Sequence, residues 1–161
     1  MMKRISVIVP FFNESEALEQ LYSEIVEEID QLPYSFEIIF VDDGSSDGSL
    51  EILRPLLITD SRVRLIRLRR NFGKSAALSV GFASARGDCI VTMDADLQDK
   101  PSEMKKLLDK LSEGYDLVSG WKRVRHDPIT KRWPSKFFNL VTSLLTGVPL
   151  HDINCGFKAY R

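Results

Sequence analysis

The sequence predicts an α/β protein in which an open, mostly parallel sheet is flanked by helices. Short apolar runs of strand length alternate along the chain with longer segments whose apolar residues recur at helical spacing. Such alternation is typical of parallel strands joined by right-handed crossovers. Three of the apolar runs also end in acidic or amide side chains. In open α/β sheets ligands bind beyond the carboxyl ends of the strands, so these ends are the expected site.

The first predicted unit begins with an apolar strand at residues 5–9, which Pro10 ends. Asn13 is expected to cap the following helix, and Glu16, three residues further on, would complete a capping box. The apolar stripe of this helix consists of Leu18, Leu21, Tyr22, Ile25 and Ile29.

The second unit begins at residues 36–41, a nearly continuous apolar run that is typical of a buried parallel strand. Ser46 or Asp47 is expected to cap the next helix, which carries Leu50 and Leu53 on its apolar side.

Three further strands complete the predicted sheet. Residues 62–68 mix apolar with basic side chains, which favours a position near an edge of the sheet, and a helix rich in small residues follows at 74–86. Residues 88–93 form the fourth strand. A helix at 101–111 begins with a proline, and residues 115–119 form the fifth strand.

Length and composition favour one soluble domain. The chain has 161 residues, of which 43% are hydrophobic and 28% are charged. Its two cysteines, Cys89 and Cys155, are expected to be reduced and internal rather than disulfide-bonded or bound to zinc. We expect neither a signal peptide at the start nor an apolar stretch of the roughly 18 residues that a membrane span needs.

Charge is strongly segregated along the chain although the net charge is −1. Residues 5–53 contain no Lys or Arg, whereas residues 54–74 and 122–136 are mainly basic. The basic blocks are either solvated faces or contacts for anionic ligands. Nucleic acid is disfavoured as the ligand, because no known nucleic-acid-binding motif or interleaved aromatic pattern is present.

Asp94 and Asp96 directly follow the fourth apolar run and precede Pro101, which opens a helix. Because residues two apart in a strand point to the same face, the two carboxylates are expected to converge. Hard oxygen ligands of this kind suit Mg²⁺ or Mn²⁺, which could in turn hold a diphosphate. A solvated acidic loop is the alternative interpretation.

The other strand ends carry further candidate ligands. Of Asp42 and Asp43, one is expected to cap the turn that Gly44 completes, and the other to accept a hydrogen bond from a nucleotide base or ribose. Glu14 is a second candidate, or simply an acid that the helix dipole favours. Lys74 adds a cation at a helix start, where an anion is already favoured, unless it is an ordinary exposed lysine.

The first strand-to-helix turn, residues 10–14, lacks the G-x-G-x-x-G pattern that binds a dinucleotide, and the chain has no P-loop. Acidic side chains rather than glycines therefore surround the expected pocket. A bound phosphate group would need a cation to neutralise it, which again points to Asp94 and Asp96.

Five ordered motifs resemble those of family 2 glycosyltransferases, most closely the branch that contains dolichol-phosphate mannose synthase and bacterial polyprenyl-phosphate glycosyltransferases. The resemblance covers essentially the whole chain. The motifs are Val9-Pro-Phe-Phe-Asn-Glu14, Asp42-Asp-Gly-Ser-Ser-Asp-Gly48, Arg70-Asn-Phe-Gly-Lys74, Asp94-Ala-Asp-Leu-Gln-Asp99 and Cys155-Gly-Phe-Lys158.

This resemblance implies one GT-A catalytic domain over residues 1–161, shortened at its C-terminal end relative to the family. It implies an inverting, metal-dependent hexosyltransferase that takes a sugar from a GDP- or UDP-sugar. By this likeness the residues that bind the nucleotide-sugar are Pro10, Glu14, Asp42, Asp43, Lys74 and Asp94. Asp94, Asp96 and Gln98 are the implied ligands of Mg²⁺ or Mn²⁺, and Asp96 and Asp152 are the implied catalytic residues.

The implied acceptor is a polyprenyl or dolichyl phosphate. Its phosphate would contact Lys122, which replaces the usual Arg of the family, together with Lys131 or Arg132 and Ser135. A lipid phosphate is already largely ionised at neutral pH, since its second pKa is about 6. It therefore needs positioning by cations more than it needs a base. A hydroxyl acceptor would need one, and Asp152 is then the candidate.

The resemblance further implies a cytoplasmic chain whose intact protein acts at the cytoplasmic face of a membrane; a homo-oligomer is left open. An amphipathic helix at residues 135–145 would lie at the membrane interface or pack in the core. One alternative function is transfer to a saccharide or glycolipid hydroxyl, and another is donor binding with poor turnover. A receiver-type signalling domain that binds Mg²⁺ is disfavoured, because Arg69 and Arg70, not an acid, follow the third strand.

Overall fold

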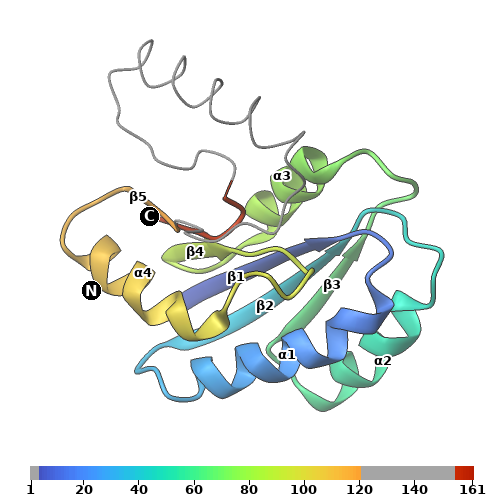
Figure 1. The fold of residues 1–161 in the computed structure, drawn as a ribbon, viewed down its shortest axis with the longest axis horizontal. Coiled ribbons are helices and arrows are strands. Elements are labelled where there is room, and N and C mark those ends of the chain that lie inside the picture. The colour runs from blue at the N-terminus through green and yellow to red at the C-terminus, as the bar shows by residue number, and fades with distance from the viewer. Residues whose placement is uncertain (1–3, 121–154) are drawn as a thin grey trace, which may run out of the picture.

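A six-stranded sheet forms the centre of the computed structural model, which describes residues 4–120 and 155–161. Its strands are β1 (Arg4–Phe11), β2 (Ser35–Asp42), β3 (Val63–Arg67), β4 (Cys89–Thr92), β5 (Leu117–Ser119) and β6 (Lys158–Tyr160). They lie in the order β3-β2-β1-β4-β6-β5 (Figure 1). The β3-β2, β2-β1 and β1-β4 pairs are parallel, whereas β6 is antiparallel to β4 and β5. The predicted open, mostly parallel sheet is confirmed, with β3 at an edge.

Helices cover both faces of the sheet (Figure 1). The four α-helices of the described residues are α1 (Ser15–Ile29), α2 (Ser49–Thr59), α3 (Lys74–Ser84) and α4 (Met104–Ser112), the last preceded by a 3₁₀ turn, η1 (Pro101–Glu103). Residues of α1, α2 and α4 share one hydrophobic cluster, and α3 packs into a second cluster on the opposite face. None of these helices is long and apolar enough to cross a membrane, as judged over residues 4–120 and 155–161.

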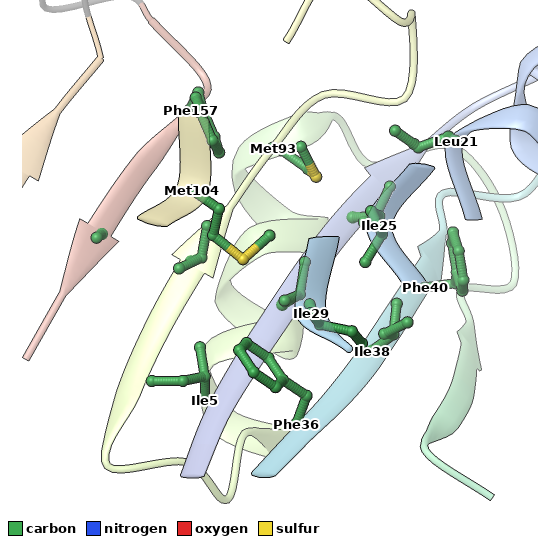
Figure 2. Packing of buried hydrophobic residues seen from close by; sticks show 14 of the residues in the cluster. Ile5, Leu21, Ile25, Ile29, Phe36, Ile38, Phe40, Met93, Met104 and Phe157 are labelled. Atoms are coloured by element: carbon green, nitrogen blue, oxygen red, sulfur yellow. The ribbon is translucent and has the colours of Figure 1, made fainter. Parts of the chain in front are cut away.

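Strand alternation sends the side chains of β1 into both clusters. Ile5, Val7 and Val9 belong to the larger cluster, which packs against α1, and Ile8 belongs to the cluster under α3. Figure 2 shows the larger cluster, where side chains of β1 and β2 meet those of α1. Because side chains on both faces are buried, β1 is a central strand whose position is fixed from two sides.

The two cysteines are buried thiols, as predicted, and both belong to the larger cluster. The strand β6 was not predicted. It is only three residues long and lies antiparallel between β4 and β5, so that β5 does not pair with β4. A three-residue strand is too short to give a detectable alternation of apolar residues.

The predicted helix caps are wrong at both α1 and α2. The residue before α1 is Glu14 and the residue before α2 is Gly48, and neither caps its helix with a side chain. Asn13 has a φ of 57° and its Oδ1 accepts from the Ser46 amide instead. The Asp47 carboxylate accepts from backbone amides at the start of each helix, at Ser15 (2.9 Å) and Ser49 (3.1 Å). Asn13 and Asp47 therefore join the loops before α1 and α2 to each other, and Asp47 also binds the first amide of α2.

A buried carboxylate ties together the amino-terminal parts of the strands. Glu37 in β2 is 1% exposed and accepts from Ser6 Oγ (2.7 Å), Arg64 Nη1 (2.8 Å) and the Arg86 amide (2.7 Å), while Arg4 forms a longer ion pair with it. Burial alone would raise the pKa of Glu37, but these hydrogen bonds outweigh it and lower the pKa. Arg64, one of the basic residues of the edge strand β3, thus pairs with the buried carboxylate of Glu37.

Candidate functional site

A pocket of about 290 Å³ lies at the carboxyl ends of the parallel strands, where the sequence predicts the site. Four carboxylates and one lysine are its charged lining residues within the described chain: Glu14, Asp43, Asp94, Asp96 and Lys74. The remaining lining residues are Pro10, Phe11, Phe12, Asn71, Gly73, Ala77 and Ala95. Segments that are far apart in the sequence, after β1, β2, β3 and β4, thus meet in one acidic pocket.

The loops after β1 and β2 are joined by hydrogen bonds that fix the Glu14 side of the pocket. The Asn13 amide donates to Ser45 Oγ (2.9 Å), and the Glu14 amide donates to Ser49 Oγ (3.2 Å). Glu14 is consequently held with its carboxylate on the pocket wall. Burial, and then the negative charges of Asp96, Asp47 and Asp94, raise the pKa of Glu14. The contribution of the neighbouring carboxylates to this rise reflects the negative charge gathered in the pocket, which favours a bound cation.

The two aspartates at the end of β2 have different roles. Asp42 is fully buried, and its Oδ1 accepts from the Ser45 amide (2.7 Å), which closes the turn at Gly44. Its Oδ2 faces Arg67 Nε at 3.3 Å and does not line the pocket. Asp43 lines the pocket, and its two oxygens accept from the backbone amides of Phe72 and Gly73, each at 2.8 Å. Asp42 therefore shapes the turn, and Asp43 holds the loop in front of α3.

Lys74 is the first residue of α3 and reaches across the pocket to the carboxylate of Asp94, with which it forms an ion pair. The residue before it, Gly73, has a φ of 92°, a backbone conformation that residues other than glycine rarely adopt. The Asp43 carboxylate and the Gly73 backbone together determine where α3 starts and where its first side chain points.

A tight turn after β4 presents Asp94 and Asp96. Asp99, which is 3% exposed, accepts from the Asp94 amide through Oδ2 (3.0 Å), and Asp96 Oδ1 accepts from the Gln98 amide (3.1 Å). Leu97 has a φ of 60°, so the chain reverses sharply within this turn. Both Asp94 and Asp96 line the pocket, whereas the exposed Gln98 is not among its lining residues.

Gly156 lies against the Asp94 carboxylate, just before β6. A β-carbon added at this position would lie 2.3–2.5 Å from the carboxylate atoms of Asp94, which is closer than atoms can approach. The Gly156 carbonyl also accepts from Thr92 Oγ1 in β4 (2.7 Å). The glycine of the Cys155-Gly-Phe-Lys158 motif therefore makes room for the Asp94 carboxylate.

The donor set suits a hard divalent cation. Among residues 4–120 and 155–161, no group of three or more His, Cys, Asp or Glu side chains is arranged to hold a metal. Mg²⁺, however, is commonly bound by one or two carboxylates plus substrate phosphates, without an all-protein cage. The two carboxylates of Asp94 and Asp96 on one pocket wall fit that mode of binding, and Gln98 could join them only by turning toward the pocket.

The expected acceptor residues lie outside the described part of the chain. They are Lys122, Lys131, Arg132, Ser135 and Asp152, and the expected helix at 135–145 falls in the same region. The predicted residues that the structure does bring together are Pro10, Glu14, Asp43, Lys74, Asp94 and Asp96.

Several residues of the site were not predicted. Phe11 and Phe12 both line the pocket: Phe11, at the end of β1, is 4% exposed, and Phe12, just past it, is 41% exposed. The available signal was the pair of aromatic residues after Pro10, which was expected to end the strand, although β1 continues to Phe11. Asp99 gave no such signal, because the sequence does not distinguish an acid that accepts a hydrogen bond within its own turn from any other acid in a loop.

Comparison with known proteins identifies the family. Residues 6–161 match the family model described as glycosyl transferase family 2. The undecaprenyl-phosphate 4-deoxy-4-formamido-L-arabinose transferase of Pseudomonas fluorescens (strain SBW25) is 40% identical over 158 residues, which are 98% of this chain and 46% of that protein. The enzyme of the same name from Aeromonas hydrophila is 38% identical over 161 residues, 99% of this chain and 49% of that protein. The chain thus spans about half the length of these relatives.

Solved structures show the same fold. A mannosyltransferase from Pyrobaculum calidifontis, in complex with GDP-Man and Mn²⁺, matches with a TM-score of 0.72 and 24% identity over 99% of this chain and 45% of that chain. Glucosyl-3-phosphoglycerate synthase from Mycobacterium tuberculosis, in complex with Mn²⁺ and UDP-glucose, matches with a TM-score of 0.74 and 23% identity over 98% of this chain and 56% of that chain. The receiver-type alternative is thereby excluded. The chain belongs to glycosyl transferase family 2, and its sheet and helices form a GT-A fold.

Proposed function

We propose that this chain is the catalytic domain of a metal-dependent inverting glycosyltransferase that moves a sugar from a nucleotide-sugar to a polyprenyl phosphate. The observation that carries the proposal is the pocket in which Glu14, Asp43, Asp94 and Asp96 meet Lys74 at the strand ends. Four carboxylates would repel a diphosphate unless a divalent cation lay between them. The relatives at 38–40% identity, which are named as undecaprenyl-phosphate transferases, support the lipid phosphate as acceptor.

The donor half of the reaction is assigned to described residues. Asp94 and Asp96 would hold Mg²⁺ or Mn²⁺, with Gln98 as a further proposed ligand. Such a cation neutralises the diphosphate and stabilises the charge that develops on the leaving group. Pro10, Phe12 and Glu14 border the space proposed for the nucleoside. Asp42 supports that space through its turn, and Asp43 positions the loop that carries Lys74.

The acceptor half rests on the family resemblance. We propose that Lys122, Lys131 or Arg132, and Ser135 position the lipid phosphate, and that Asp152 lies near the reaction centre. Because a polyprenyl phosphate is anchored in a bilayer, the reaction would occur at the cytoplasmic face of a membrane. The phosphate oxygen would attack the anomeric carbon from the side opposite the leaving diphosphate, which inverts the configuration.

The test of this proposal is sugar transfer with the acceptor varied and the donor kept constant. We expect the 161-residue chain to transfer sugar from a GDP- or UDP-sugar to undecaprenyl phosphate in detergent, and not to free saccharides. Lys122→Ala and Asp152→Asn should each reduce transfer at least about tenfold, as expected when a charged positioning contact is lost. Faster transfer to a saccharide hydroxyl would replace this proposal by the hydroxyl-acceptor alternative, and near-normal transfer by both variants would contradict the acceptor assignment.

A further inference from the structure

Lys74 and Asp94 form an ion pair across the proposed donor pocket. Their side chains are 49% and 24% exposed, so the pair is accessible to a ligand entering from solvent. Among the described residues that line the pocket, Lys74 is the only cationic one. Asp94, in turn, is one of the two carboxylates proposed to hold the metal. The same carboxylate therefore has two candidate cationic partners.

Both partners of this pair are held in place by other residues. The Asp43 carboxylate accepts from the two backbone amides just before Lys74, at 2.8 Å each, and so fixes the start of α3. Asp99 fixes the backbone of Asp94 from the opposite side. Gly156 leaves just enough room beside the Asp94 carboxylate. A contact between two independently positioned side chains is a feature of the site rather than a chance meeting of mobile surface groups.

We propose that Lys74 is an internal counter-cation, which holds Asp94 before the divalent metal binds and is displaced by it. The freed ammonium group then faces the diphosphate of the donor. This inference rests on the proposed function and adds an order to it: the metal must compete with Lys74 for Asp94, while the diphosphate gains Lys74 as a partner. Metal and nucleotide then favour each other's binding, because each helps to complete the exchange.

The variant Lys74→Met tests this exchange, since it should change two affinities in opposite directions. Without its competitor, Mn²⁺ alone should bind about two- to fivefold more tightly, the range expected for loss of a partly exposed ion pair. In saturating Mn²⁺, GDP or UDP, whichever binds the unmodified chain, should bind about tenfold more weakly, because a charge-assisted contact to phosphate is lost. Mn²⁺ binding is measured by the electron paramagnetic resonance signal of the free ion, and nucleotide binding by calorimetry.

Lys105→Met is the matched control. Lys105 forms an i,i+4 ion pair with Asp109 on α4 (2.6 Å), and the variant removes the same charge from an exposed Lys–Asp pair outside the pocket. Both affinities should stay within about twofold of the unmodified chain, as expected for a solvent-screened surface charge. A second variant, Lys74→Gln, shows whether an effect comes from loss of the lysine or from the methionine that replaces it. Both variants should have the circular dichroism spectrum of the unmodified chain.

Unchanged or weaker binding of Mn²⁺ alone by both Lys74 variants would overturn the inference. Failure of the unmodified chain to bind any nucleoside diphosphate with Mn²⁺ would instead contradict the proposed function. The Mn²⁺-only comparison would still decide whether Lys74 competes for Asp94, so the two failures are distinguishable.

Discussion

Replacing Asp96 by Asn is expected to reduce sugar transfer at least about 100-fold, because loss of a metal-ligating carboxylate should cost more than the 10–100-fold effect of its supporting partners. Asp96 lies on the pocket wall and its side chain is exposed. Within residues 4–120 and 155–161, the one hydrogen bond found for its carboxylate is accepted from the Gln98 amide. Asn keeps an oxygen for that amide. The melting temperature should therefore change by no more than about 1 °C, as for other surface substitutions. The measurement is initial rate against Mn²⁺ concentration.

Asp109→Asn provides the control for this prediction. It removes one exposed carboxylate that pairs with Lys105 on α4, outside the pocket lining. Its transfer rate and its dependence on Mn²⁺ should equal those of the unmodified chain. If Asp96→Asn retained more than about a tenth of the rate with an unchanged Mn²⁺ dependence, Asp96 would not be a metal ligand.

Replacing Glu37 by Ala is expected to lower the free energy of unfolding by about 2–4 kcal/mol, somewhat less than for a fully buried pair because Arg64 is partly exposed. Glu37 is 1% exposed and accepts from Ser6 Oγ, Arg64 Nη1 and the Arg86 amide, and without it Arg64 would keep only the Ser84 carbonyl as acceptor for that nitrogen. For a chain of this size the loss corresponds to a fall in melting temperature on the order of 10 °C. Chemical denaturation at pH 7 measures it.

Glu103→Ala is the matched control, because Glu103 forms an exposed pair with Lys106 at 2.7 Å and should contribute no more than about 1 kcal/mol.

The effect of Glu37 should also depend on pH. Its pKa is lowered from the ordinary value of 4.5, so its stabilisation is present above that pH and is lost as the pH falls through the lowered pKa. The stability difference between the unmodified chain and Glu37→Ala should thus shrink as the pH falls below 4.5. An equal loss for Glu103→Ala and Glu37→Ala would show that burial of Glu37 carries no special weight.

The sequence predicted the parallel part of the sheet because its signals are local. The strands β1, β2 and β4 are mainly apolar, β3 mixes apolar with basic residues, and each is followed by a helix, so these patterns identify the strands without knowledge of their neighbours. The order of the strands was not accessible in the same way. Insertion of β6 between β4 and β5 depends on pairing between residues about 40 to 70 positions apart, which leaves no local pattern in the three residues 158–160.

The site was predicted as a set of candidates, and the structure assigns their positions. Asp94 and Asp96 do line one pocket, but they lie in the turn after β4 and not in a strand, so the alternation expected of a strand is not what brings them together. The sequence could not separate Asp42 from Asp43, because their different roles follow from contacts with Ser45, Arg67 and the amides before α3. The capping expectation for Asn13 failed for a related reason: a partner 33 residues away competed with the local one.

The most direct test of the central claim, an acidic pocket that binds a nucleotide diphosphate through a divalent cation, is a thermal-shift panel. GDP- and UDP-sugars, each with and without Mn²⁺, are added to the 161-residue chain. At a ligand concentration 100-fold above the dissociation constant, linkage stabilises the native state by about 2.7 kcal/mol. For a chain of this size that is a rise of roughly 5–10 °C. We predict such a rise for at least one donor and only when Mn²⁺ is present. If no donor gave a metal-dependent shift, Asp94 and Asp96 would not form a metal-diphosphate site and the account would be contradicted.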